Sequence, residues 1–466
     1  MSAAGADASN PSRPVRPHRA RRGRGLAVWM NGELVGHWYR NRIGTEFFQY
    51  EASWAKSTRA RALSLSLPLP AGNAALQGPA VGHYFDNLLP ESRDIRERVQ
   101  RRYRVPRLDA FDLLTAIGRD CVGAVQLLPP DAVPEGVHII QGKPLTEEAI
   151  EQLLRDTTGD SGVGRGTSDE FRISLAGMQE KAALLLEDGQ WMQPIGTTPT
   201  THILKLAMGG PPAYQYDLTD SVANEWVCLQ ILAALGLAVA TARMASFGGL
   251  EVLVVERFDR QRLTRSAYSN TPWIARLPQE DFCQATGTPA ARKYEVDGGP
   301  SVKACLDILA GSGRAEQDRT AFLLAQFAFW LMAAIDGHGK NFSIALRPGN
   351  KYFLTPLYDV ISAWPIIGEA PGKLSLHKAS LAMAVRSKNA HYKLLEIQPR
   401  HWRTLAEKSG APDAFEAMVI LSEAVDGALE QVGGHLPDRF PRKVWKSVST
   451  GMAQQVERFG RGLRDA

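Results

Sequence analysis

Three polar residues in the second half of the chain have the types and spacing that phosphoryl-transfer chemistry needs. Asp336 directly follows a long apolar stretch, Asn341 lies five positions later, and Asp359 lies 18 positions after Asn341. A carboxylate can accept the proton of an attacking hydroxyl, and a neutral amide oxygen can help to hold Mg²⁺ without adding negative charge beside that base. The spacing therefore predicts a base at Asp336 and metal ligands at Asn341 and Asp359.

This spacing is typical of the catalytic loop of protein kinases. Tyr358-Asp359 stands where the second metal-binding aspartate of a kinase falls, although no glycine follows it. Alone, the pattern D-x-x-x-x-N more often caps a helix and shapes a turn, but the apolar helix expected before Asp336 and the strand expected before Tyr358 favour the catalytic interpretation. We interpret His338 as a structural or nucleotide-contacting residue, because Asp336 already supplies the base.

The elements expected from residue 171 to residue 256 follow the order of a kinase N-lobe. Hydrophobic periodicity predicts a turn at 176–179 and strands at 171–175, 181–186, 202–206, 238–246 and 250–256. A helix is expected from an N-cap at Ser221 to about Leu235. In this order Lys205, in mid-strand, would grip phosphates, and Glu225, one turn into the helix, would position the lysine. A strand lysine alone more often snorkels to water, so the prediction depends on the order.

The first part of the chain is expected to form a separate unit. Residues 26–36, centred on Asn31-Gly32, predict a hairpin with a type I′ turn. The alternation at 63–69 predicts a strand, and helices are expected at 85–103, 108–118 and 146–155. We interpret the glycine-rich stretch 159–168 as a flexible linker and not as a nucleotide loop, because no apolar strand precedes it.

Composition and charge narrow the class of protein. The 466 residues are 44% hydrophobic and 22% charged, which predicts two or three folding units. The net charge of +5 arises in residues 1–25, and the charges of the remaining residues sum to zero. The body of the protein therefore supplies no broad basic field that would attract nucleic acid. We expect residues 1–25, a basic tail, to be a disordered extension or the result of a start codon assigned too early. The tail lacks the apolar region of a secretory signal, and the apolar run 321–335 is too short to span a bilayer. Four cysteines without a C-x-x-C pair predict reduced thiols in a cytoplasmic protein.

Several longer motifs resemble the HipA family of bacterial kinase toxins, from about Leu26 to the C-terminal region. The motifs are LSLSLP at 63–68, FDNLLPE at 85–91, IGRD at 117–120, VGAV at 122–125, FRIS at 171–174, VERFDR at 255–260, RLPQED at 276–281, DGHGKN at 336–341 and YD at 358–359. The resemblance implies an α/β (α+β), two-lobed protein-kinase-like fold. Its parts would be the tail 1–25, an extra N-terminal α/β subdomain at 26–145, an N-lobe at 146–260 and a mostly helical C-lobe at 261–466.

The resemblance also implies ATP and Mg²⁺ as cofactors and gives each site residue a role. Asp336 would be the catalytic base, and Ser174 would be an autophosphorylation site whose added charge ejects the neighbouring nucleotide loop and switches the enzyme off. The implied ATP-binding residues are Ala176, Gly177, Met178, Gln179, Glu180 and Lys181 in the loop, Lys205, the hinge residues Glu256, Arg257 and Phe258, and then His338, Gly339, Lys340, Asn341, Tyr358 and Asp359.

For function, the resemblance implies the toxin of a type II toxin–antitoxin module. Such a kinase phosphorylates a protein serine, with glutamyl-tRNA synthetase the best-known type of substrate, and so inhibits translation and growth. A HipB-like helix-turn-helix antitoxin would neutralise it and repress the operon together with it. The family's basic DNA-contacting positions after Pro399-Arg400-His401 fall here on Glu407 and Gly410, with Lys408 between them, so operator DNA is expected to be bound mainly through the antitoxin. A catalytically silent co-repressor and a small-molecule phosphotransferase are the alternatives.

Overall fold

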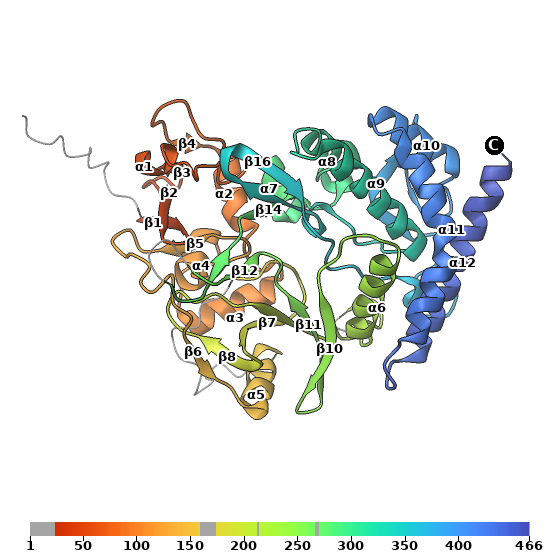
Figure 1. The fold of residues 1–466 in the computed structure, drawn as a ribbon, viewed down its shortest axis with the longest axis horizontal. Helices are drawn as coiled ribbons and strands as arrows, with labels where there is room; N and C mark the ends of the chain where they lie inside the picture. Colours follow the sequence, from red (N-terminus) through yellow and green to blue (C-terminus); the bar gives the residue numbers. More distant parts are fainter. Residues whose placement is uncertain (1–23, 159–173, 212–213, 266–269, 466) are drawn as a thin grey trace, which may run out of the picture.

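The computed structural model describes residues 24–158, 174–211, 214–265 and 270–465. The chain runs from an N-terminal five-stranded sheet at one end of the molecule, through a six-stranded sheet, to a bundle of helices at the opposite end (Figure 1). In the described part of the chain, no helix is long and apolar enough to cross a membrane. The four cysteines, which were predicted to be reduced, are buried and form no disulfide with one another.

The N-terminal unit is built on a sheet with the strand order β4-β3-β2-β1-β5. Asn31 and Gly32 adopt positive φ angles of 48° and 82° between the first two strands, which confirms the predicted hairpin turn. The first strand begins at Arg24, inside the segment expected to be the tail. The elements are β1 Arg24–Met30, β2 Glu33–Arg40, β3 Glu46–Tyr50, α1 Ala52–Ala55, β4 Leu76–Gln77, α2 Pro79–Asp86, α3 Arg93–Tyr103, α4 Ala110–Ile117 and β5 Gln126–Leu128.

Two predictions for this unit were wrong. Residues 63–69 form a turn with one isolated bridge between Ser64 and Leu67, because the Tyr50 hydroxyl accepts from the Leu63 amide and donates to the Leu67 carbonyl. The single helix expected at 85–103 is two helices, α2 and α3. Pro90 lies between them and cannot continue a helix, and the Ser92 hydroxyl caps the second one.

The N-lobe is built on a six-stranded sheet with the order β10-β11-β9-β7-β8-β6. Because β6 belongs to it, this lobe starts before the boundary expected at residues 145/146. The predicted strands at 181–186, 202–206 and 250–256 and the helix at 146–155 are confirmed. The elements are β6 Gly142–Pro144, α5 Glu147–Thr158, β7 Lys181–Glu187, β8 Gln190–Pro194, β9 His202–Leu206, α6 Ser221–Ala234, β10 Ala242–Phe247 and β11 Leu250–Glu256.

Three details of this lobe differ from the expectation. Ser221 is the first residue of α6 and not its N-cap, because its hydroxyl accepts from the Met208 amide at 2.8 Å. The strand expected from 238 begins only at Ala242, since the preceding segment bridges to Leu357 in the C-lobe. Ser174 and Leu175 are not in a strand, and residues 159–173, with the predicted linker and most of the strand expected at 171–175, lie outside the described residues.

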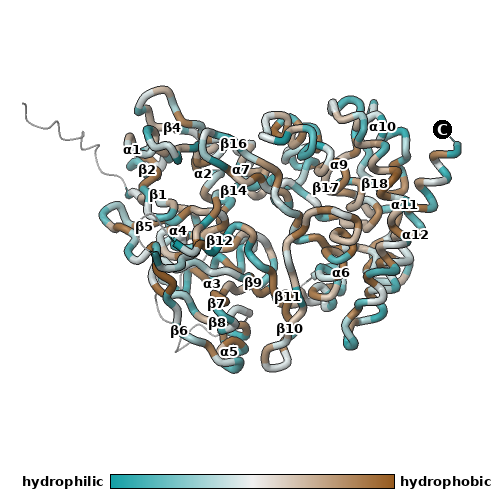
Figure 2. Tube along the Cα trace, viewed as in Figure 1, coloured by the Kyte–Doolittle hydropathy of each residue, from teal (hydrophilic) through white to brown (hydrophobic). Residues whose placement is uncertain are grey.

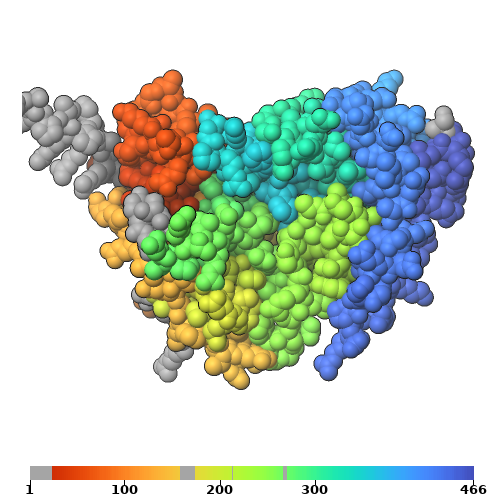
Figure 3. Space-filling view, in the orientation of Figure 1, coloured from red at the N-terminus to blue at the C-terminus, as the bar shows by residue number. Residues whose placement is uncertain are grey.

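The C-lobe packs around the apolar helix α9, which ends when Ala333 adopts a positive φ of 49° and turns the chain toward Asp336. Helices α8, α11 and α12 pack against it, and hydrophilic residues recur along the outermost helix, α12 (Figure 2). In Figure 3 the red N-terminal unit lies directly against green and cyan residues of the C-lobe. The elements are β12 Arg260–Leu263, β13 Trp273–Arg276, β14 Gln279–Asp281, α7 Phe282–Thr286, α8 Val302–Leu309, α9 Ala315–Met332, β15 Ser343–Arg347, β16 Lys351–Leu354, β17 Ser380–Arg386, β18 Ala390–Lys393, α10 Pro399–Lys408, α11 Asp413–Gly434 and α12 Arg442–Arg464.

Candidate active site

Lys205 joins the two lobes at the bottom of a cleft. Its ammonium group lies 2.7 Å from the carboxylate of Glu225 in α6 and 2.7 Å from that of Asp359, which follows β16. Burial alone would lower the pKa of Lys205, but the two carboxylates outweigh it and hold that pKa above its ordinary value. The lysine therefore stays charged, and the structure brings Lys205 together with Glu225, its predicted partner, and with Asp359, a predicted metal ligand.

Asn341 lies beside Asp359 and is fixed by it. The Asn341 amide nitrogen donates to the Asp359 main-chain oxygen at 3.0 Å, and the Asn341 Oδ1 atom is buried without a hydrogen-bond partner in the described structure. Burial alone would raise the pKa of Asp359, but Lys205 and Lys181 hold it well below its usual range. An unpartnered amide oxygen next to an ionised carboxylate is a pair of ligands that suits Mg²⁺.

Asp336 lies on the same cleft, just past the end of α9. Its side chain is 59% exposed, so an acceptor can reach it from solvent. Burial by the surrounding cleft walls raises the pKa of its carboxyl above the ordinary value, and a hydrogen bond from the Tyr294 hydroxyl, 2.5 Å from Oδ1, acts in the opposite direction. A raised pKa makes a carboxylate a better proton acceptor.

The loop between Asp336 and Asn341 is tied to the N-terminal unit. Lys340 donates to the Asp281 carboxylate at 2.7 Å and to the side chain of Asn87 at 2.9 Å. Burial lowers the pKa of His338 to about 3, so this histidine is neutral and does not compete with Asp336 for the proton. Both side chains are buried, and the Tyr358 hydroxyl donates to the Lys340 carbonyl at 2.8 Å, so the loop is held in one conformation.

The predicted nucleotide loop, residues 176–181, closes one wall of the cleft. Gly177 has a φ of 108°, which favours glycine, and its carbonyl accepts from the Glu91 amide at 3.1 Å. Lys181 donates to the Ala176 carbonyl at 2.6 Å, and burial lowers the pKa of Lys181 to about 8. Gln179 donates to the Leu206 carbonyl at 2.5 Å, Glu180 pairs with Arg98, and Met178 is 57% exposed.

The predicted hinge, residues 256–258, is fixed by a buried group of charges. The Arg257 guanidinium donates to the Asp259 carboxylate at 2.8 Å and to the Cys121 carbonyl at 2.9 Å. Asp120 of the N-terminal unit accepts from Arg260 at 2.9 Å and from Arg276 at 3.0 Å. These five charged residues, called the hinge cluster below, fix the course of the backbone.

Ser174 lies next to the nucleotide loop and is fully buried. Its hydroxyl donates to the Leu88 carbonyl at 2.7 Å, and its amide donates to the Asp120 carbonyl at 3.1 Å. In this conformation Ser174 makes no hydrogen bond to Asp336 in the described structure.

A cavity of about 210 Å³ connects these groups. Both apolar and charged residues line it. Among the lining residues are Leu175, Lys181, Ile203, Lys205, Glu225, Val255, Phe258, Asp336, His338, Asn341, Tyr358 and Asp359. An apolar slot that opens onto cations and metal ligands suits a flat base attached to phosphates.

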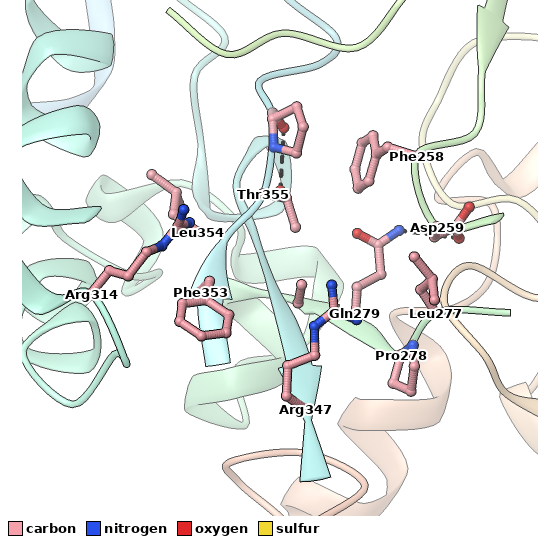
Figure 4. Close-up of a pocket in the computed structure, with 12 residues that line it drawn as sticks. Phe258, Asp259, Leu277, Pro278, Gln279, Arg314, Arg347, Phe353, Leu354 and Thr355 are labelled. Carbon is pink, nitrogen blue, oxygen red and sulfur yellow. Dashed lines mark hydrogen bonds between the residues drawn. The ribbon is translucent and has the colours of Figure 1, made fainter. Parts of the chain in front are cut away.

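A second hollow, of about 350 Å³, shares Phe258, Asp259 and Gln279 with this cavity (Figure 4). Its other walls come from β15, β16 and the turn before β14. Arg314 and Arg347 line it, but it contains neither Lys205 nor the pair Asn341 and Asp359.

Four residues of the cleft were not predicted from the sequence. Lys293 pairs with Glu91 at 2.6 Å, Asp281 anchors Lys340, and Tyr294 contacts Asp336. Glu91 and Asp281 lie inside the motifs at 85–91 and 276–281, so the sequence contained a signal by which they could have been found. Lys293 and Tyr294 lie in a polar segment that offers no local pattern.

Comparisons with known proteins agree with this geometry. The family model of the HipA N-terminal domain matches residues 26–128, and that of the HipA-like C-terminal domain matches residues 173–434. The candidate kinase Y4mE of Sinorhizobium fredii is 34% identical over 391 residues, which are 83% of this chain and 86% of that protein. The serine/threonine-protein kinase toxin HipA of Shewanella oneidensis is 28% identical over 330 residues, 67% of this chain and 69% of that protein.

A solved structure confirms the fold. The chain matches HipA in the Shewanella oneidensis complex of HipA, HipB and operator DNA with a TM-score of 0.76 and 22% identity, covering 94% of this chain and 98% of that one. The expected mixed α/β, two-lobed kinase-like fold is therefore confirmed. With both family models matched in order and a relative at 34% identity, the chain belongs to the HipA family of serine/threonine-protein kinase toxins.

Proposed function

We propose that this protein is an ATP-dependent serine/threonine protein kinase and the toxin of a type II toxin–antitoxin module. The observation that carries the proposal is the double contact of Lys205, 2.7 Å from both Glu225 and Asp359, in the cleft that also holds Asp336 and Asn341. A lysine held between a helix glutamate and a metal-binding aspartate is the arrangement that an active kinase needs.

The cleft fits ATP and Mg²⁺. The base would lie between Ile203 and Val255 on one side and Phe258 on the other, and the phosphates would lie against Lys205 and the loop 176–181. The unpartnered Asn341 oxygen and the Asp359 carboxylate would hold the metal. Bound Mg²⁺ would neutralise charge on the phosphates during transfer.

The residues of the chain then perform defined tasks. Asp336 accepts the proton of a substrate hydroxyl as that oxygen attacks the γ-phosphorus of ATP. The bond between this phosphorus and the bridging oxygen breaks, ADP leaves with the electron pair, and the proton remains on the carboxyl group until product leaves. Lys205 stabilises the negative charge of the phosphates, and Glu225 keeps the lysine in place. His338, neutral and buried, leaves Asp336 as the proton acceptor.

We further propose a serine of an aminoacyl-tRNA synthetase as the substrate, which would explain inhibition of translation and growth. Phosphorylation of Ser174 would inactivate the kinase, because a phosphate group cannot fit where its hydroxyl is fully buried against Leu88. The resemblance to the HipA family supports both of these proposed roles.

A HipB-like antitoxin is proposed as the partner, and it would carry most of the contact with operator DNA. On and beside α10, Lys408 donates to the Ser387 carbonyl at 2.8 Å and Arg403 lies over the ring of Phe415 at 4.8 Å. These two basic groups are engaged within the chain, and the neighbouring Glu407 would repel phosphate.

The test is the intact mass of the purified protein after incubation with Mg²⁺ and ATP, compared with Asp336→Asn. We expect a gain of one phosphate on Ser174 in the wild type alone, and growth arrest by the wild type alone. A wild-type protein that starts unphosphorylated, gains no phosphate and does not bind ATP would favour a silent co-repressor.

A further inference from the structure

One carboxylate oxygen of Asp336, Oδ1, already accepts a hydrogen bond from a hydroxyl group of the chain itself. The phenol oxygen of Tyr294 lies 2.5 Å from Asp336 Oδ1. The Tyr294 ring stands edge-on against the His338 ring, with 5.0 Å between centroids and 87° between planes. The other carboxylate oxygen, Oδ2, faces His338 Nε2 at 3.9 Å. While Tyr294 donates at this distance, its hydroxyl holds a position from which a substrate hydroxyl would donate to Oδ1.

Anchors on both sides hold Tyr294 in this position. On one side, Lys293 pairs with Glu91 at 2.6 Å, and its carbonyl accepts from the Gly339 amide at 3.3 Å. On the other side, the Glu295 carboxylate accepts from the Ala384 amide at 2.7 Å. It also accepts from Nε and Nη2 of the Arg386 guanidinium, at 3.0 and 2.6 Å. The position of Tyr294 is therefore built by the C-lobe and the N-terminal unit together.

The segment nevertheless faces solvent on the side from which a substrate would approach. Val296, two residues after Tyr294, is 68% exposed, and the Asp336 side chain is more than half exposed. A protein acceptor can thus reach the segment and displace it, whereas a water molecule makes too few contacts to do so.

We propose that Tyr294 is a specificity-determining residue that occupies the acceptor position of Asp336 and yields only to a protein substrate. The inference rests on the proposed kinase function. While Tyr294 is in place, its hydroxyl satisfies the base in the way a serine hydroxyl would, so Asp336 does not activate water and ATP is not hydrolysed. The binding energy of the protein substrate moves the phenol aside, and the serine hydroxyl takes over its hydrogen bond.

The experiment compares Tyr294→Phe with the wild-type full-length protein. The variant keeps the ring against His338 and removes only the oxygen. ADP release is measured with Mg²⁺ and ATP in the absence of an acceptor, and then with dephosphorylated casein as the acceptor probe. Since one charge-assisted hydrogen bond no longer has to be broken, we expect acceptor-free hydrolysis to rise about tenfold and the KM for casein to fall, with kcat little changed.

Arg386→Ala is a second variant that leaves Tyr294 intact but releases Glu295. It should also raise acceptor-free hydrolysis and lower the KM for casein, but by less than Tyr294→Phe does. Tyr39→Phe, which removes a phenol oxygen from the N-terminal sheet, is the matched control and should resemble the wild type. Asp336→Asn should abolish hydrolysis in the background of either variant.

The outcomes separate this inference from the proposed function. If the wild type transfers phosphate but Tyr294→Phe shows unchanged hydrolysis, or a fall in kcat, then Tyr294 does not close the acceptor position and the inference is wrong. If the wild type neither binds ATP nor transfers phosphate, the proposed function fails and the inference fails with it.

Discussion

The Asn341 side chain donates its amide hydrogen to the main-chain oxygen of Asp359 at 3.0 Å and thereby leaves its own oxygen buried and unpartnered in the described structure. Asp359 itself has a φ of 59°, an unusual backbone conformation for a residue other than glycine. A buried polar atom without a partner and a strained neighbour are costly unless a ligand uses them, so this pair indicates a metal site.

Asn341→Ala is expected to raise the Mg²⁺ concentration that gives half-maximal phosphoryl transfer by about tenfold. The reason is that the variant loses one metal ligand, and a tenfold change corresponds to about 1.4 kcal/mol of binding free energy. Ser174 phosphorylation measured across a Mg²⁺ titration would show it. The affinity for ATP at saturating Mg²⁺ should stay close to that of the wild type. An unchanged Mg²⁺ dependence would mean that Asn341 only shapes the turn.

Lys205→Met should abolish ATP binding and also destabilise the fold. The substitution leaves the carboxylates of Glu225 and Asp359 facing each other without a cation, and Glu225 is buried. Breaking a buried ion pair costs about 3 kcal/mol, which urea unfolding can measure. Combining Lys205→Met with Glu225→Met should recover most of that loss without restoring ATP binding. A single variant as stable as the wild type would contradict the ion-pair argument.

Replacing Ser174 distinguishes a switch from a structural hydroxyl. Ser174→Ala loses one buried hydrogen bond, worth about 1 kcal/mol, and should keep its ability to bind ATP. Ser174→Asp places a charge against the Leu88 carbonyl in a fully buried position, so the nucleotide loop should leave its place and ATP affinity should fall at least tenfold. Calorimetric titration with ATP would test both variants. Equal ATP affinity of the Asp variant and the wild type would exclude the switch.

Glu280 should make stability depend on pH. It is fully buried, and burial raises the pKa of its carboxyl from the ordinary 4.5 to about 8. A raised carboxyl pKa contributes stability that is present below pH 4.5 and is lost as the pH rises toward 8, since the folded state must then hold a buried charge. Glu280→Gln cannot ionise. Between pH 5 and pH 8 the free energy of unfolding of the wild type should therefore fall by about 3 kcal/mol relative to that of the variant. Denaturant unfolding at the two pH values checks this; a constant difference between the two proteins would contradict the assignment.

The parts of the site that the sequence could predict lie inside single elements or short loops. Lys205 in a strand, Glu225 in a helix and Asp336 at a helix end have local patterns, and their order along the chain indicates how they meet. Tyr294 could not be found in this way, because its contact with Asp336 depends on anchors at Glu91 and Arg386, far away in the sequence.

The same dependence on contacts with distant residues explains why the strand predicted at residues 63–69 was wrong. Alternating apolar side chains suit a strand, but here they also suit a turn that places Leu63 and Leu67 in the core. The Tyr50 hydroxyl, at the end of β3, decides between the strand and the turn. Local periodicity contains no information about such a partner.

The hinge cluster has a consequence for the descent of this family. Asp120 lies in the segment matched by the N-terminal family model, and Arg257, Arg260 and Arg276 lie in the segment matched by the C-terminal one. A hybrid gene that joined these segments from two relatives would leave buried arginines unneutralised unless both parents carried the same set of charges. We therefore expect the two segments to have been inherited together, with recombination between them rarely surviving selection.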